Sequence, residues 1–80
     1  MPVVFRHKGF RFAFYSNEGD PREPMHIHAE RGGCEAKFWL QPDVQLAYNG
    51  GFDAGTLRKV LDIVEQHRSR FERAWHDYFG

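Results

Sequence analysis

The stretch "MHIHAERGGCEAKFWL", residues 25–40, decides the fold. Gly32 and Gly33 stand at its centre, and the residues on both sides alternate between apolar and polar types. A Gly-Gly pair between two alternating runs predicts an antiparallel hairpin with a two-residue turn, in which Arg31 faces Cys34. One face then carries the apolar pairs Ala29–Ala36, Ile27–Phe38 and Met25–Leu40. The opposite face carries Glu30–Glu35, His28–Lys37 and His26–Trp39.

The preceding residues predict a second hairpin. "MPVVFRHKGFRFAFYS", residues 1–16, alternates with period two and has Lys8-Gly9 as its turn. The expected pairs are His7–Phe10, Phe5–Phe12 and Val3–Phe14. Residues 17–24, "NEGDPREP", are rich in turn formers and charge and predict an exposed loop. The pairing between the two hairpins stays open at this point.

After residue 40 the pattern changes from strand to helix. Residues 44–47 predict a short strand, and a turn follows at 49–51. From Asp53, which suits a helix N-cap, apolar residues recur with a period of 3.6 and predict one helix of about six turns. The expected fold is therefore α+β, with a small curled antiparallel sheet of three to five strands, including the two N-terminal hairpins, packed on one long C-terminal helix. Residues 1–80 form a single domain in this prediction.

Composition narrows the class of protein. Eleven basic residues balance eleven acidic ones, so no long-range field draws the chain to a polyanion. Aromatic residues make up 16% of the chain, which is enough for a core. The single cysteine excludes an internal disulfide, and no segment resembles a signal peptide or a membrane span. We expect a cytoplasmic protein without a membrane partner, and we predict no cofactor.

The candidate site is the sheet face that the helix does not cover, which we expect to be open to solvent. Its chemistry fits RNA cleavage without a metal. Two imidazoles, His26 and His28, could divide the roles of general base and general acid, with Lys37 stabilising charge on the phosphorane. Four further side chains would contact RNA or a protein partner: Arg6, Arg11, Tyr15 and Trp39. Whether the chain is an enzyme at all stays open.

Three alternatives use the same face. The first is a metal site, in which His26, His28 and Glu30 would supply two nitrogen ligands and a carboxylate. Lys37, directly opposite His28, counts against a divalent cation there. The second is a protein-docking surface without catalysis. The third is an ordinary solvated surface.

The segments "FAFYSNEGDPREPMHIHAE", "AKFWL" and "AWHDYFG" together resemble the DUF4160 family of short bacterial proteins. The resemblance rests on Pro24, His26 and His28, with Tyr15, Ser16 and Asn17 before them. Met25 is a departure, because many members carry a second proline there. The resemblance implies a bacterial cytoplasmic protein whose gene often lies beside that of another small protein, an arrangement like a toxin–antitoxin pair.

From the resemblance we expect one component of a toxin–antitoxin type module, with a small cognate protein as its partner and RNA as the favoured target. The role of toxin or antitoxin is left open by the sequence. A homo-oligomer is also compatible with it. In the toxin hypothesis His26 and His28 act on RNA, whereas in the others the same residues dock a partner or hold a metal.

Overall fold

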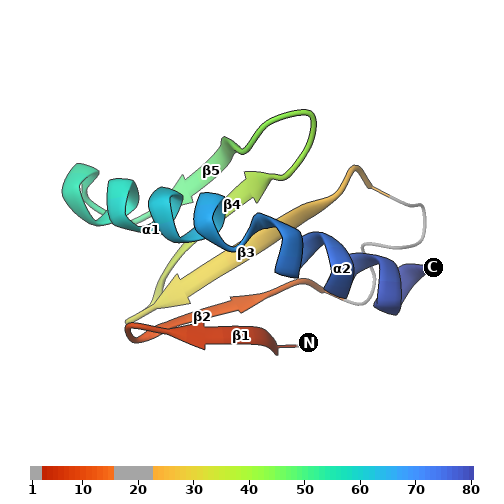
Figure 1. Cartoon of the computed structure of the whole chain (residues 1–80). Coiled ribbons are helices and arrows are strands. Elements are labelled where there is room, and N and C mark those ends of the chain that lie inside the picture. The colour runs from red at the N-terminus through yellow and green to blue at the C-terminus, as the bar shows by residue number, and fades with distance from the viewer. Residues whose placement is uncertain (1–2, 16–22) are drawn as a thin grey trace.

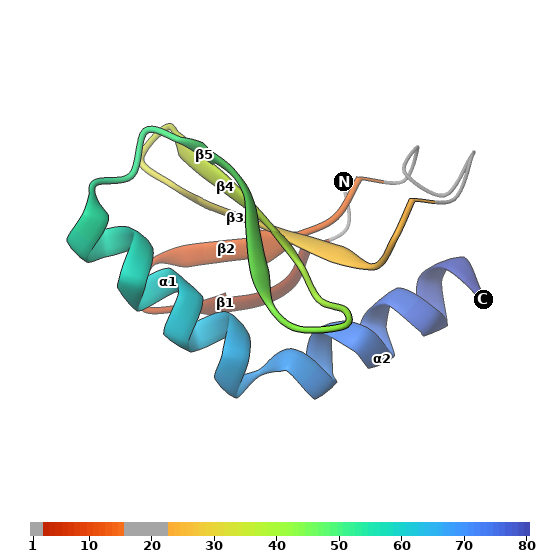
Figure 2. The ribbon, with the colours of Figure 1, turned by 90° about the horizontal axis from the view of Figure 1, so that it is seen from above.

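Five antiparallel strands form one open sheet in the order β1-β2-β3-β4-β5. The computed structural model describes residues 3–15 and 23–80. The strands are β1 (Val3–His7), β2 (Phe10–Ala13), β3 (His26–Arg31), β4 (Cys34–Trp39) and β5 (Gln45–Gly50). Two helices, α1 (Ala54–Gln66) and α2 (Arg68–Phe79), follow and lie on one side of the twisted sheet (Figures 1 and 2). The α+β class is confirmed, and the five strands fall within the predicted range.

The hairpin of β3 and β4 has the predicted register throughout. Arg31 pairs with Cys34, and the pairing continues without a shift to His26 and Trp39. The backbone amide of Leu40 donates to the carbonyl of Met25 at 3.0 Å, which extends the ladder by one more pair. Gly32 and Gly33 have φ values of 58° and 83°, and positive φ at both central residues is what a type I′ hairpin turn requires.

The hairpin of β1 and β2 follows the prediction only near its turn. His7 pairs with Phe10, and Phe5 pairs with Phe12. The predicted pair of Val3 with Phe14 is wrong, because a bulge between Val3 and Phe5 shifts the register and places Val3 opposite Ala13. Of the predicted loop 17–24, only Glu23 and Pro24 lie within the described residues.

The two hairpins join through β2 and β3, the pairing that the sequence left open. The paired residues are Arg11–Glu30, Phe12–Ala29 and Ala13–His28. The fifth strand runs over 45–50 instead of 44–47, so residues 49 and 50 of the predicted turn belong to the strand. A second bulge, between Lys37 and Phe38, shifts the register of β4 against β5.

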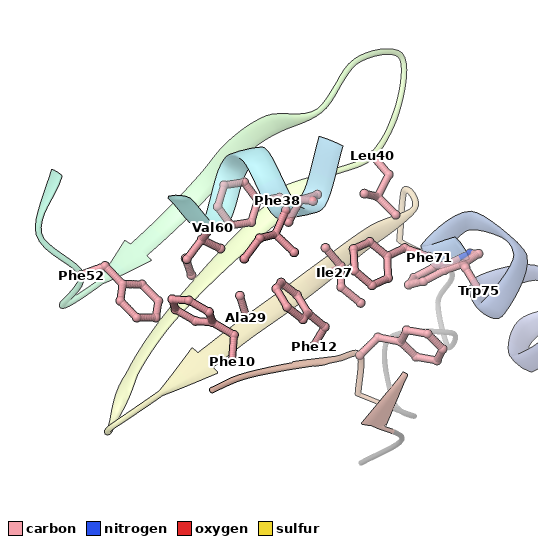
Figure 3. Packing of buried hydrophobic residues seen from close by; sticks show 14 residues of the cluster. Phe10, Phe12, Ile27, Ala29, Phe38, Leu40, Phe52, Val60, Phe71 and Trp75 are labelled. Carbon is pink, nitrogen blue, oxygen red and sulfur yellow. The ribbon is translucent and has the colours of Figure 1, made fainter. Parts of the chain in front are cut away.

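The core lies between the sheet and the helices (Figure 3). Phenylalanine side chains from β2 and β4 meet aliphatic and aromatic residues from both helices. Its fully buried members include Phe12, Ile27, Phe38, Leu40, Val60, Val64 and Phe71. Asp53 caps α1 as predicted, since its carboxylate accepts a hydrogen bond of 2.7 Å from the backbone amide of Thr56.

The prediction of one long helix is wrong, because the chain bends between α1 and α2 at His67. The bend is visible in Figure 2. No proline or glycine marks it, and side-chain contacts hold it instead. The His67 ring packs on Phe5 of β1 at 4.7 Å between centroids. The Arg68 guanidinium donates a hydrogen bond of 2.7 Å to the carbonyl of Pro42 in the β4–β5 loop. Neither helix has both the length and the apolar composition that a membrane crossing requires.

Acidification should weaken the fold through His67. Burial lowers the pKa of His67 below its ordinary value of 6.5, and the charges of His7 and Arg70 add to the effect. Between the lowered pKa and 6.5, the unfolded chain binds a proton that the folded chain does not, so the free energy of unfolding falls as pH drops through this window. In urea titrations from pH 7.5 to 5.5, His67→Gln should show a shallower fall than the parent chain. Equal slopes would contradict this role.

Candidate functional site

The register gathers the predicted site residues on the sheet face opposite the core. His28 pairs with Lys37, and His26 pairs with Trp39, as predicted. Arg11 joins them through its pairing with Glu30 on β3. Arg6 lies opposite Arg11 on the edge strand β1, where it is exposed.

The expectation that the two imidazoles are open to solvent is wrong. His26 is 0% exposed and His28 is 7% exposed. The reason for the burial of His26 lies in α2, which extends past the end of the sheet where β3 begins (Figure 2). From there Trp75 packs on the His26 ring, with 4.9 Å between centroids, and Trp39 lies at 5.7 Å. The His26 ring is therefore part of the packed interior.

The His26 ring is oriented by the backbone that leads into β3. Its Nδ1 lies 2.8 Å from the carbonyl oxygen of Pro24. A carbonyl oxygen can only accept, so Nδ1 carries the proton and donates it. The ring of His28 lies 5.1 Å away, nearly perpendicular to that of His26 at 87°. The two imidazoles thus meet edge to face inside the fold.

A carboxylate orients His28. Nδ1 of His28 lies 3.0 Å from one oxygen of Glu35, and the hydroxyl of Tyr15 donates to the other oxygen at 3.0 Å. The Tyr15 ring also packs on the His28 ring, with 4.4 Å between centroids. Glu35 therefore fixes the ring orientation of His28, in the way that a carboxylate orients a catalytic or a structural histidine.

Two cations of this face, Lys37 and Arg11, are paired within the chain. Lys37 donates to Glu23 at 2.9 Å, and Arg11 forms an ion pair with Glu30. The ammonium of Lys37 also lies 4.6 Å from the centroid of the Trp39 ring. A phosphate bound at Lys37 or Arg11 would have to compete with these carboxylates, because both cations already have a counter-charge.

The structure does not assemble the alternative metal set of His26, His28 and Glu30. The Glu30 carboxylate faces Arg11, and the His26 Nδ1 faces a carbonyl oxygen. Within 3–15 and 23–80, no group of three or more His, Cys, Asp or Glu side chains is placed to hold a metal ion.

Two residues of this site were not predicted. Glu23 neutralises Lys37, but it stands in a charged loop whose sequence has no periodicity to indicate its neighbours. Trp75 covers His26, but its helical spacing indicated only a core position. The role of Trp75 depends on the contact between α2 and the start of β3, and the role of Glu23 depends on a contact between the segment before β3 and Lys37 of β4.

Comparison with known proteins places the chain in a family. The family model described as "Domain of unknown function (DUF4160)" matches residues 9–76. The chain belongs to the DUF4160 family. No curated protein and no solved structure gives a significant match. The DUF4160 match spans β2 to β5, α1 and most of α2, and it leaves β1 outside.

Within the DUF4160 match, β5 forms an uncovered edge of the sheet. Its residues 45–49 are exposed, and Leu46 and Tyr48 keep 46% and 57% of their surface open. A groove of about 460 Å³ runs between β5 and α1, with apolar lining from Phe38, Leu46, Leu57 and Leu61. Arg58 and Asp62, of opposite charge, also line it. Tyr48 pairs with Lys37, so this edge adjoins the histidine face.

Proposed function

We propose that this DUF4160 protein is the partner-binding component of a two-protein module of toxin–antitoxin type in the bacterial cytoplasm. The observation that carries the proposal is the contrast between the two surfaces. The histidine face buries its imidazoles and pairs Lys37 and Arg11 internally, whereas β5 leaves apolar side chains and a strand edge open. Binding therefore fits the exposed groups better than catalysis does.

The partner we propose is the small protein encoded by the neighbouring gene, and it contributes an extended segment that pairs with β5. An open strand edge offers backbone donors and acceptors to such a segment. The six residues of β5, "QLAYNG", include no charge and no proline, the residues that commonly protect edges. The opposite edge, β1, carries Arg6 and a bulge. An alternating apolar segment would place side chains in the groove beside Leu46.

Leu46→Lys should weaken the complex with the neighbouring gene product by about 30-fold or more, which corresponds to about 2 kcal/mol for a hot-spot residue. The substitution places a charge in the apolar groove. Isothermal titration calorimetry of the purified proteins measures the effect. Val3→Lys, on the opposite edge and 39% exposed, is the matched control and should bind like the parent chain.

Two results with the Leu46→Lys variant would contradict the proposal. One is a complex whose affinity does not change with Leu46→Lys. The other is self-association of the chain alone, measured by sedimentation and lost in Leu46→Lys, because the edge would then be occupied by a second copy. Failure of the two purified proteins to bind at all would have the same consequence.

A second candidate function is RNA cleavage, as a toxin, and the contact of Glu35 with His28 favours it. The Glu35 carboxylate orients the His28 ring, and the His26 ring lies 5.1 Å from it. Two imidazoles in this arrangement resemble an acid–base pair. Expression without the partner would then slow growth and fragment RNA. His28→Asn retains a donor at the position of Nδ1 but cannot titrate, so it should abolish both effects in a chain that stays folded, which circular dichroism checks. Healthy cells with intact RNA would remove this candidate.

A further inference from the structure

A second cavity, of about 310 Å³, lies between the β1–β2 turn, the end of β3 and α1. Its lining brings together basic side chains from three elements: Lys8 from the first turn, Arg31 from the end of β3 and Lys59 from α1. Asp62 is the acidic residue among the described lining residues. Positive charge therefore predominates here, in a chain whose formal net charge is zero.

These three cations differ from Arg11 and Lys37 of the histidine face, because none of them forms an ion pair with a carboxylate of residues 3–15 or 23–80. The basic residues found in ion pairs with carboxylates across 3–15 and 23–80 are Arg11, Lys37 and Arg68. Over the same residues, none of the lining cations Lys8, Arg31 and Lys59 forms an ion pair. Like charges that converge on one concavity repel each other, and a bound anion relieves that repulsion.

Arg31 is held in place before any ligand arrives. Its guanidinium carbon lies 4.0 Å from the centroid of the Phe10 ring, and Nη1 donates to the carbonyl of Lys8 at 3.4 Å. A guanidinium that stacks on an aromatic ring presents its remaining N–H groups in a fixed plane. Such a planar set of donors matches two oxygens of a phosphate group.

The positive charges of Arg31 and Lys59 already stabilise a negatively charged group nearby. Asp53 stands at the start of α1, and its pKa is lowered first by the hydrogen bond from the Thr56 backbone amide. The charges of Lys59 and Arg31 lower it further. Both residues thus stabilise negative charge at this end of the molecule.

We propose that this cavity binds a phosphate group, with Arg31 as the two-pronged donor and Lys8 and Lys59 as flanking charges. The volume is at the lower end of the range of small-molecule sites and suits a phosphate with part of a nucleoside. The group can come from a free phosphate ester or from the backbone of RNA. The proposal goes beyond partner binding, because the lining basic residues lie apart from β5.

Titration followed by amide chemical shifts tests the site, with the whole chain and at constant ionic strength. The three probes are inorganic phosphate, a 5′-mononucleotide and a single-stranded RNA oligonucleotide. Saturable shifts are expected at residues 8–9, 31–32 and around Lys59. Arg31→Gln should weaken binding at least tenfold. Arg73→Gln, exposed on α2 and outside this cavity, is the matched control and should bind like the parent chain.

The result that overturns the proposal is the lack of saturable shifts with all three probes. An equal loss with Arg31→Gln and Arg73→Gln would overturn it as well, since that points to diffuse attraction. If Arg31→Gln lowers the melting temperature, Lys59→Gln is the second variant, and unchanged affinity in it contradicts the site. If RNA binds tenfold tighter than the mononucleotide, the bound phosphate group belongs to the RNA backbone. If the two affinities are equal, it belongs to a free phosphate ester.

The two proposals fail independently. Arg31→Gln should leave the complex with the partner protein intact, and Leu46→Lys should leave phosphate binding intact. Loss of phosphate binding with an unchanged complex therefore bears on the cavity alone.

Discussion

Phe12→Ala should lower the free energy of unfolding by about 3 to 5 kcal/mol, the usual range for a large buried aromatic residue. The Phe12 side chain is 0% exposed, and its ring packs on Phe71 of α2 at 5.3 Å and on Phe5 of β1 at 6.1 Å. A domain of this size is stable by roughly 4 to 12 kcal/mol. The substitution therefore removes a large part of the stability, which chemical denaturation measures.

Leu46→Ala is the matched control, because Leu46 is apolar but 46% exposed on the sheet edge. It should change the stability of the isolated chain by less than about 1 kcal/mol. A Phe12→Ala protein as stable as the parent would mean that the sheet and α2 do not share one core. The described packing of the helices on the sheet would then be wrong.

His26→Ala should destabilise the fold by about 2 to 4 kcal/mol, from a cavity and an unsatisfied carbonyl oxygen. The ring fills space between Trp39 and Trp75 and donates to Pro24. His26→Asn keeps a donor at the position of Nδ1, so it should lose less than His26→Ala. Thermal and urea denaturation measure both variants.

The exposed His76 of α2 provides the control, and His76→Ala should leave stability nearly unchanged. A fully stable His26→Ala protein would contradict the structural role of the ring. It would also favour a purely catalytic role for His26, because a residue with such a role can be removed without harm to the fold.

Local patterns predicted most of the sheet. The alternation around Gly32 and Gly33 determined six residue pairs of β3 and β4, because a one-residue slip would expose Ile27 and Phe38. The two bulges could not be predicted, because nothing near Val3 or Lys37 in the sequence marks an extra residue. Nothing in the sequence marks the ends of β5 either, so its predicted boundaries also differ from the observed ones.

The bend at His67 was missed because its cause is tertiary. Residues 57–75 contain no proline or glycine, and the apolar positions before and after the polar residues 65–70 keep one helical phase, as they would in one straight helix. The bend depends on contacts of His67 with Phe5 and of Arg68 with the β4–β5 loop, which are distant in sequence. Periodicity reports which face is buried, but it does not report where a helix turns.

The sequence predicted which residues share the candidate site, but it did not predict that they are buried and paired. Alternation placed His26, His28 and Lys37 on one face, and the structure agrees. It could not predict that Trp75 would reach that face from α2, or that Glu23 would pair with Lys37. Burial and pairing depend on these distant residues, and they are the reason that we propose binding and not catalysis.

Amide hydrogen exchange of the chain with and without the neighbouring gene product tests the central claim most directly, namely that a partner strand adds to β5. The account predicts slower exchange at residues 45–50 and at the α1 residues that line the groove, with no change at residues 3–7 of β1. Unchanged exchange at 45–50, with protection instead at β1 or across residues 26–39, would contradict it.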